Sequence, residues 1–261
     1  MIQVRWACCI SVIEDKMKEV NRGNAMLLRG HIQNLRKKRC RRDFLFTAND
    51  RAEMGATSIA AGLAGLGGVA AGLGAMAMDT TEEADLLEFE LDGKPIRAWV
   101  WVSVFKDGDE VEVVAESDGD SWTGYGIRRI SDRIVALHPH CSRGRYAHYR
   151  ASFSWFLKIV GCLLFALYLI FSAVSYFSGD SLREFGVLSV KIIPGMLISA
   201  AIFGVIAYRI SRKYLGFVRL AEGIFLGFGW PRVKHIDLPA LTKKTKAPSD
   251  PGALGVLYFR Y

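Results

Sequence analysis

Residues Gly55–Met78 read GATSIAAGLAGLGGVAAGLGAMAM and contain no charged side chain. Seven of them are glycine and eight are alanine, so small side chains dominate the stretch. Small residues spaced four apart lie on one ridge of a helix and let two helices pack closely in lipid, as in a glycine zipper. We therefore predict a Gly/Ala-rich, membrane-active helical segment over residues 54–78. Its packing ridge consists of Ala60, Ala64, Gly68 and Gly72.

This Gly/Ala segment is long enough for one membrane crossing, which needs about 20 apolar residues. It is weakly suited to that role, because glycine costs about 1 kcal/mol relative to alanine in a helix. If the β-rich stretches on its two sides belong to one domain, a single crossing is impossible, since both ends then lie on one side. A hairpin turning near Gly67 has arms of about 18 Å, shorter than the roughly 30 Å hydrocarbon core. The remaining alternatives are a shallow re-entrant hairpin, a segment held by protein, or one crossing with unpaired flanking strands.

The chain before the Gly/Ala segment divides into an uncertain N-terminal extension, residues 1–25, and a first β region, residues 26–53. The extension fits the rest poorly, and Met17 or Met26 is an alternative start. Within Leu27–Phe46 the pattern predicts two strands separated by the run RKKRCRR, residues 36–42. We interpret this run as a solvated basic turn, with a lipid-headgroup or phosphate patch as the alternative.

The region after the Gly/Ala segment, residues 79–139, predicts a small all-β barrel of the OB or SH3-like kind. It opens with the acidic run DTTEEAD, which either caps a short helix or forms a linker. Turn signals about ten residues apart then separate alternating apolar runs. The predicted strands cover residues 86–91, 96–105, 110–116, 121–130 and 133–139. Trp99 and Trp101 share a face, which we interpret as a core or interface face rather than a stacking platform.

Residues 140–213 predict a transmembrane helical hairpin with basic flanks. Phe153–Phe177 and Gly186–Tyr208 are long apolar stretches, and Lys158 and Lys191 lie where their side chains can snorkel. The loop between the stretches has few basic residues, so both ends of the hairpin are expected in the cytoplasm. The predicted cytoplasmic anchors are Arg143, Arg145, Arg150, Arg209, Arg212 and Lys213.

Residues 214–261 predict one more helix and a tail rich in proline and lysine. The stretch Tyr214–Trp230 is apolar, and we expect an interfacial or hairpin-packing helix there. The tail is expected to be largely irregular, with a last β-like run over VLYFRY, residues 256–261.

Candidate chemistry is sparse in this sequence. His138, His140, Cys141 and His148 lie close in sequence, but their spacing matches no standard zinc pattern. Nucleophile-elbow, zincin and phosphate-loop motifs are all missing. We predict no enzyme, and no catalytic residue, metal or cofactor is assigned. The net charge of +8 is interpreted as cytoplasmic flanks facing anionic lipid, not as nucleic-acid binding, because Asp85–Asp132 is acidic.

Five phrases of this sequence resemble a family of bacterial membrane proteins assigned to type VI secretion as effectors. The phrases are LLRGHIQNL from residue 27, MGATSIAAGLAGLGG from 54, EEADLLEFELDG from 82, VWVSVFKDGDEVEVVAE from 100 and LHPHCSRGR from 137. The resemblance implies a Gram-negative bacterium and a role in competition between bacteria. It also implies a pore formed through a glycine zipper, for which the ridge from Ala60 to Gly72 is the matching segment.

The sequence thus predicts an α+β membrane protein of the bacterial inner membrane, multi-pass, with its β-module in the cytoplasm. The first functional hypothesis is a type VI effector that inserts into membranes and forms pores. The second is a resident immunity or accessory protein whose β-module binds a partner, and the third is a housekeeping membrane protein. The expected partners are the lipid bilayer and either further copies of the chain or a protein from a secretion gene cluster.

Overall fold

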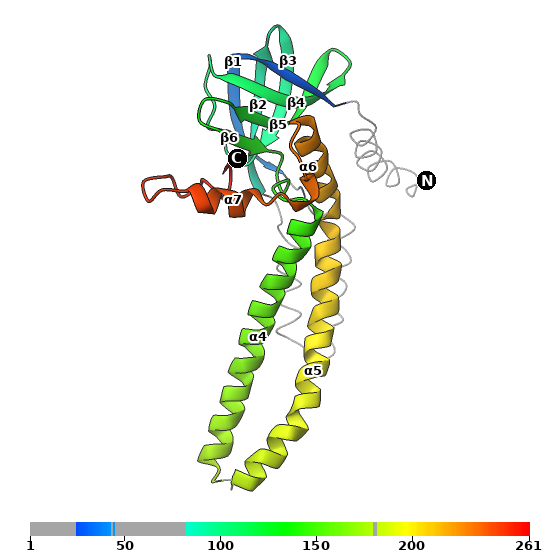
Figure 1. Ribbon diagram of the computed structural model, residues 1–261, viewed down its shortest axis with the longest axis vertical. Coiled ribbons are helices and arrows are strands. Elements are labelled where there is room, and N and C mark those ends of the chain that lie inside the picture. Colours follow the sequence, from blue (N-terminus) through cyan, green and yellow to red (C-terminus); the bar gives the residue numbers. More distant parts are fainter. Residues whose placement is uncertain (1–24, 43, 45–81, 180–181) are drawn as a thin grey trace, which may run out of the picture. The chain divides into compact units, whose positions relative to one another are not determined.

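The computed structural model describes residues 25–42, 44, 82–179 and 182–261 (Figure 1). They form two compact units, each considered by itself. The barrel unit comprises the described residues of Met1–Gly144 together with Gly216–Tyr261, and the hairpin unit is Arg145–Leu215. The chain therefore leaves the barrel unit once, makes the hairpin, and returns.

A closed five-stranded β-barrel forms the centre of the barrel unit. The strands follow the order β3-β2-β1-β4-β5, and a parallel pairing of β3 with β5 at Ile96 and Trp122 closes the ring. β6 and β7 extend the sheet beyond β5. The strands are β1 (Met26–Arg42), β2 (Glu82–Leu91), β3 (Lys94–Val100), β4 (Glu110–Asp118), β5 (Ser121–Arg129), β6 (Ile134–Leu137) and β7 (Phe259–Arg260). A small β-barrel is thus confirmed, but its ring includes β1, which precedes the predicted residues 79–139, and the predicted strand over residues 133–139 lies beyond the ring as β6.

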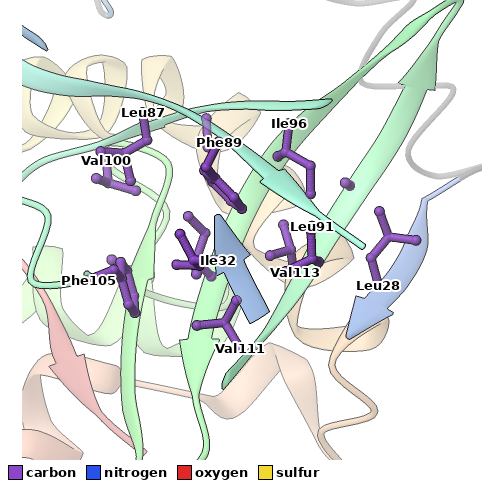
Figure 2. Packing of buried hydrophobic residues seen from close by; sticks show 14 of the residues in the cluster. Leu28, Ile32, Leu87, Phe89, Leu91, Ile96, Val100, Phe105, Val111 and Val113 are labelled. Atoms are coloured by element: carbon purple, nitrogen blue, oxygen red, sulfur yellow. The ribbon is translucent and has the colours of Figure 1, made fainter. Parts of the chain in front are cut away.

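The barrel interior is filled by side chains that alternate along the strands (Figure 2). Along β4, Val111, Val113 and Ala115 point inward, because successive strand residues face opposite sides of a sheet. Val114 between them belongs to a second cluster on the outer face. The run VEVVA is therefore almost continuously apolar because both faces of β4 are covered.

Helix α6 (Leu215–Gly227) provides the cover for this outer face. Ile224 and Phe225 are fully buried against Val114 and neighbouring strand residues. Helix α6 can approach the strand this closely because Gly227 has no side chain. A Cβ atom at that position would lie 2.7 Å from Val114. The prediction of an interfacial or hairpin-packing helix over Tyr214–Trp230 is therefore wrong, because its apolar face packs on the barrel instead of on lipid.

The tail after α6 is more ordered than the sequence predicts. A 3-10 turn (Val233–His235) leads into helix α7 (Leu238–Thr245), whose N-cap Asp237 accepts a hydrogen bond from the backbone of Ala240. Arg260 pairs with Asp250 and joins the tail to β7. Only the β-like run at Phe259 is confirmed, and Pro239 lies in the first turn of α7, where a proline is compatible with a helix.

The first strand predicted within residues 26–53 is confirmed, but the basic turn is wrong, because β1 continues through the basic residues to Arg42. The second predicted strand, over residues 43–47, lies outside the described residues except for Phe44. A bulge between Gln33 and Arg36 takes the place of the turn, with Asn34 at φ 55°. The amide of Leu35, which the bulge frees from the ladder, donates to Asp107 Oδ1 at 2.8 Å. Residues 26–31 of β1 pair with β4 and residues 32–42 with β2, so one long bent strand joins both halves of the barrel.

This pairing joins the β-rich stretches on the two sides of the Gly/Ala segment. Arg42 and Glu82 are register partners at the end of the β1–β2 ladder. The chain therefore leaves the barrel and re-enters it at neighbouring positions, and both stretches belong to one domain. The predicted segment itself, residues 54–78, lies outside the described residues.

The hairpin unit consists of two long antiparallel helices, α4 (Arg145–Phe177) and α5 (Leu182–Lys213). Both helices are long and apolar enough to cross a membrane, and no other helix among the described residues is. For the expected multi-pass protein, the described residues therefore provide two candidate spans. Helix α5 continues through Pro194, and nearby Ser199 donates to the carbonyl of Gly195 at 2.9 Å.

Candidate functional site

The predicted packing ridge of Ala60, Ala64, Gly68 and Gly72 lies outside the described residues. What the structure does place is its point of attachment, at the paired Arg42 and Glu82. Any movement or insertion of the segment must therefore be anchored at one end of the barrel.

Five of the six predicted cytoplasmic anchors gather at one end of the hairpin. Arg145 and Arg150 lie in the first turns of α4, and the others lie in the last turns of the antiparallel α5: Arg209, Arg212 and Lys213. The sixth, Arg143, has a different role, because its Nε lies 3.1 Å from Asp237 Oδ1 and ties two loops of the barrel unit together. The basic end of the hairpin thus carries five of the six predicted anchors, and Arg143 is not one of them.

Polar contacts hold the two helices together at this basic end. His148 Nε2 lies 2.9 Å from the Ser211 hydroxyl, and that hydroxyl lies 3.4 Å from Ser152 Oγ. Ser211 is 7 % exposed, so its hydroxyl gains a partner where water has little access. The pairing fixes the register of α4 against α5 and keeps the cations of both helices at one level.

The basic run of β1 is neutralised by the acidic run that begins β2. Arg39 faces Asp85 and Arg41 faces Glu83 as direct cross-strand partners. Arg41 Nε lies 3.3 Å from Glu83 Oε1. Opposite charges directly across a strand pair stabilise the pairing. The interpretation as a solvated turn is therefore wrong, and so are a helix cap or linker for Glu82–Asp85, because the two runs form one ion-pair ladder.

Asp85 closes one end of the barrel. Its side chain is on the same, inward face of β2 as that of Leu87, and Asp85 is 1 % exposed. Its carboxylate lies 3.0 Å from both Lys37 Nζ and Arg39 Nη1, and it accepts a hydrogen bond from the Ser103 amide at 2.8 Å. Burial raises the pKa of Asp85, but the Ser103 amide and the two cations outweigh burial and hold the pKa below its ordinary value.

The same cap explains why β3 is shorter than predicted. The chain bends after Val100, and the carbonyl of Trp101 accepts from Arg39 Nη1 at 2.8 Å. The carbonyl of Ser103 accepts from Lys37 Nζ at 3.1 Å. The expected strand over residues 96–105 therefore ends five residues early, because these backbone groups bind side chains of β1 instead of a neighbouring strand.

Aromatic and histidine rings pack beside the paired ends of β1 and β2. Phe44 makes edge contacts with Trp99 and Trp101 at centroid distances of 5.9 and 6.3 Å. His140 lies edge-on to Trp101, and its Nε2 is 2.7 Å from Glu82 Oε2. The two tryptophans are half-buried in this cluster. This arrangement supports the interpretation as a packed face, since an open stacking platform needs bare ring faces.

The four candidate zinc ligands are not brought together. Burial lowers the pKa of His138 to about 4, so its ring is neutral at physiological pH. Cys141 is buried under α6 in the second cluster, and burial raises the pKa of its thiol. His148 belongs to the helix contact described above. Within the described part of the chain, no group of three or more metal-ligating side chains converges.

A shallow depression of about 780 Å³ lies over the bulge of β1 and the β2–β3 hairpin. Its lining carries Arg36 and Arg97 together with Glu88, Glu90 and Asp107. Arg97 Nε lies 3.6 Å from Glu88 Oε1, so one arginine is paired within the lining. The acidic side chains therefore outnumber the basic ones by one, and the depression is not a basic groove.

The searches of family models, of curated proteins and of solved structures found no match to this chain. The geometry above therefore carries the functional argument. Two features of it were not predicted from the sequence: the capping of the barrel by Asp85 and the contact of His148 with Ser211. The sequence does contain a signal for the capping by Asp85, because a basic run and an acidic run of matching spacing lie on the two sides of the insertion. No local signal marks the second, since 63 residues separate its members.

Proposed function

We propose that this protein is a resident two-span protein of the bacterial inner membrane whose barrel lies in the cytoplasm and binds a partner protein. The observation that carries the proposal is the gathering of Arg145, Arg150, Arg209, Arg212 and Lys213 at one end of the hairpin. Basic residues flanking a span favour the cytoplasmic side. Both ends of the hairpin unit continue directly into the barrel unit, so the barrel is on the basic side.

The barrel is an OB-like binding module in this proposal. Its support is the cyclic strand order β1-β2-β3-β5-β4 with a parallel β3–β5 contact, which is the arrangement of five-stranded Greek-key barrels of that kind. The preferred partner is a protein, because the depression over β2 and β3 carries one acidic side chain more than basic ones and is not the basic groove that nucleic acid requires.

A second candidate function is that of a type VI effector that forms pores through the Gly/Ala segment. The pairing of Arg42 with Glu82 favours it in one respect, because a segment tethered at both ends can insert as a unit while the barrel stays folded. Residues Ala60, Ala64, Gly68 and Gly72 are then the packing ridge between copies.

The two candidates differ in what happens when the chain reaches the periplasm. The experiment measures membrane potential in bacteria that produce the full chain with or without a periplasmic export signal. An unchanged potential in both cases, with the chain stably inserted and its C-terminus in the cytoplasm, is expected of a resident protein. Collapse of the potential only after export supports the effector, provided that Gly72→Leu prevents it and Gly72→Ala does not.

A further inference from the structure

Two lysines interrupt the otherwise apolar, outward faces of the hairpin. Lys158 on α4 and Lys191 on α5 are both exposed. Lys158 Nζ lies 5.5 Å from the centre of the Trp155 ring. A charged side chain inside hydrocarbon is costly unless it reaches an interface or a partner. The position of these lysines along the hairpin axis therefore constrains how the hairpin is seated in a bilayer.

Three contacts between α4 and α5 give the register of the hairpin. His148 meets Ser211, the Phe156 ring lies 3.6 Å from where a Cβ of Gly204 would be, and Phe171 stacks on Phe185 at 6.0 Å. Interpolation between the last two contacts places Lys191 level with Ala166. Lys158 is eight residues earlier on α4, which corresponds to about 12 Å along the axis.

This register shows that the two uncharged stretches are staggered. The stretch after Lys158 extends from Ile159 toward the connecting loop, whereas the stretch after Lys191 extends from Ile192 toward the basic end. Because the helices are antiparallel, the stretches overlap only between the levels of Lys158 and Ala166. A hydrocarbon core of about 30 Å corresponds to about 20 helical residues, so every position of the hairpin in a bilayer includes at least one lysine.

One position satisfies both lysines together. A lysine stem reaches about 6 Å, so lysines about 12 Å apart that extend in opposite directions span about 24 Å, and slight thinning of the hydrocarbon core around them brings both ammonium groups to headgroups. The core then covers residues 153–172 of α4 and 185–206 of α5. The exposed aromatic side chains support this position, because Trp155 and Tyr208 lie near one boundary and Tyr176 and Phe177 just beyond the other.

We propose that the hairpin is seated at this single depth, with Lys158 bound to headgroups on the basic side and Lys191 to headgroups on the opposite side. The occupant of the exposed apolar faces is thus a bilayer with Cys162 at its midplane. The inference rests on the proposed function, since it requires the hairpin to be inserted.

Cysteine accessibility in the full chain tests this depth. The protein is reconstituted in phosphatidylethanolamine–phosphatidylglycerol vesicles, labelled with a maleimide, and each site is quantified by mass spectrometry. The native Cys162 is expected to react at least tenfold more slowly than Ala151→Cys or Val174→Cys, and all three at similar rates in denaturing detergent. Equal rates at all three positions in vesicles would mean that the hairpin is not inserted, which overturns the proposed function as well.

A lysine variant separates the depth from insertion alone. Without Lys191 the hairpin is free to shift toward the arrangement that Lys158 prefers, so Lys191→Leu is expected to slow labelling of Val174→Cys several-fold. The matched control Lys191→Arg keeps the charge and should leave the rate unchanged. If the slowest labelling is found at a position other than Cys162, the proposed depth is wrong although the hairpin is inserted. The same conclusion follows if Lys191→Leu leaves the labelling rate of Val174→Cys unchanged.

Discussion

Two clusters of positive charge in this protein look alike in sequence and differ in structure. RKKRCRR on β1 lies opposite acidic residues of β2, and Asp85 binds two of its cations within 3.0 Å. The cations at the ends of α4 and α5 are instead gathered by helix pairing, and no acidic residue is present in the first turn of α4. The difference teaches that a basic run indicates a lipid-facing surface only where its own domain offers no acidic partner.

The largest expected effect comes from removing the shared carboxylate of the ladder. Asp85→Ala leaves the buried Ser103 amide without an acceptor and separates Lys37 and Arg39 from their common partner. We expect the free energy of unfolding of the barrel to fall by about 3 kcal/mol, measured by denaturant titration of tryptophan fluorescence in detergent. Asp85→Asn, whose amide oxygen still accepts from Ser103, should lose less. A loss below about 1 kcal/mol for Asp85→Ala would contradict the role of the cap.

The pH dependence of stability sharpens the same point. The pKa of Asp85 lies below its ordinary value of 3.8 in the folded protein, so its contribution is fully present above that value. The contribution is lost as the pH falls through the folded pKa. We therefore expect the stability difference between the native chain and Asp85→Asn to be constant from pH 7 to 5 and to shrink below about pH 4. A difference that stays constant down to pH 2.5 would mean that the charge of Asp85 contributes nothing.

Removing cations from the other cluster should change orientation and not folding. Arg209→Gln with Arg212→Gln removes attraction of about 1 kcal/mol per cation to anionic lipid, so the ratio of hairpin orientations should change by about 30-fold. Protease accessibility of the C-terminal tail in sealed vesicles measures that ratio. The matched control, Arg41→Gln with Arg42→Gln, removes the same charge from the ladder. An equal change of orientation in the control would remove the distinction between the two clusters.

The smallest effect is expected at the rim of the ladder. Arg41 and Glu83 have exposed side chains, at 70 % and 51 %, and lie 3.3 Å apart. Ion pairs of this kind contribute little in water, so Arg41→Ala should change the free energy of unfolding by no more than about 0.5 kcal/mol. The same titration as for Asp85 provides the measurement. A loss as large as that of Asp85→Ala would show that the ladder acts as one network.

The sequence predicted the elements whose signal is local. Alternation and turns at Asp92–Gly93 and Lys106–Asp109 placed β2, β4 and β5 closely, and uninterrupted apolar length placed α4 and α5. The apolar pattern of α6 was also visible, but the same pattern serves a membrane surface or a barrel face. What decided between them is a long-range fit, in which Gly126 and Gly227 allow the helix to approach the strands.

The parts of the candidate site that the sequence missed depend on pairing between distant residues. A basic run predicts a turn when considered alone, and it becomes a strand here because Glu83 and Asp85, more than forty residues later, neutralise it. The six predicted anchors were grouped by sequence distance to the hairpin. Five share one end, whereas Arg143 is taken by Asp237, a residue 94 positions away that no local rule relates to it.

The register pairing of Arg42 with Glu82 has a consequence for how this protein can diverge. The 39 residues between them begin and end at positions one strand spacing apart. Lengthening such an insert is inexpensive, because each doubling costs only about 0.6 kcal/mol of closure entropy. We therefore expect the barrel to tolerate changes in the length of this insert, provided that Phe44, which packs on Trp99 and Trp101, is kept.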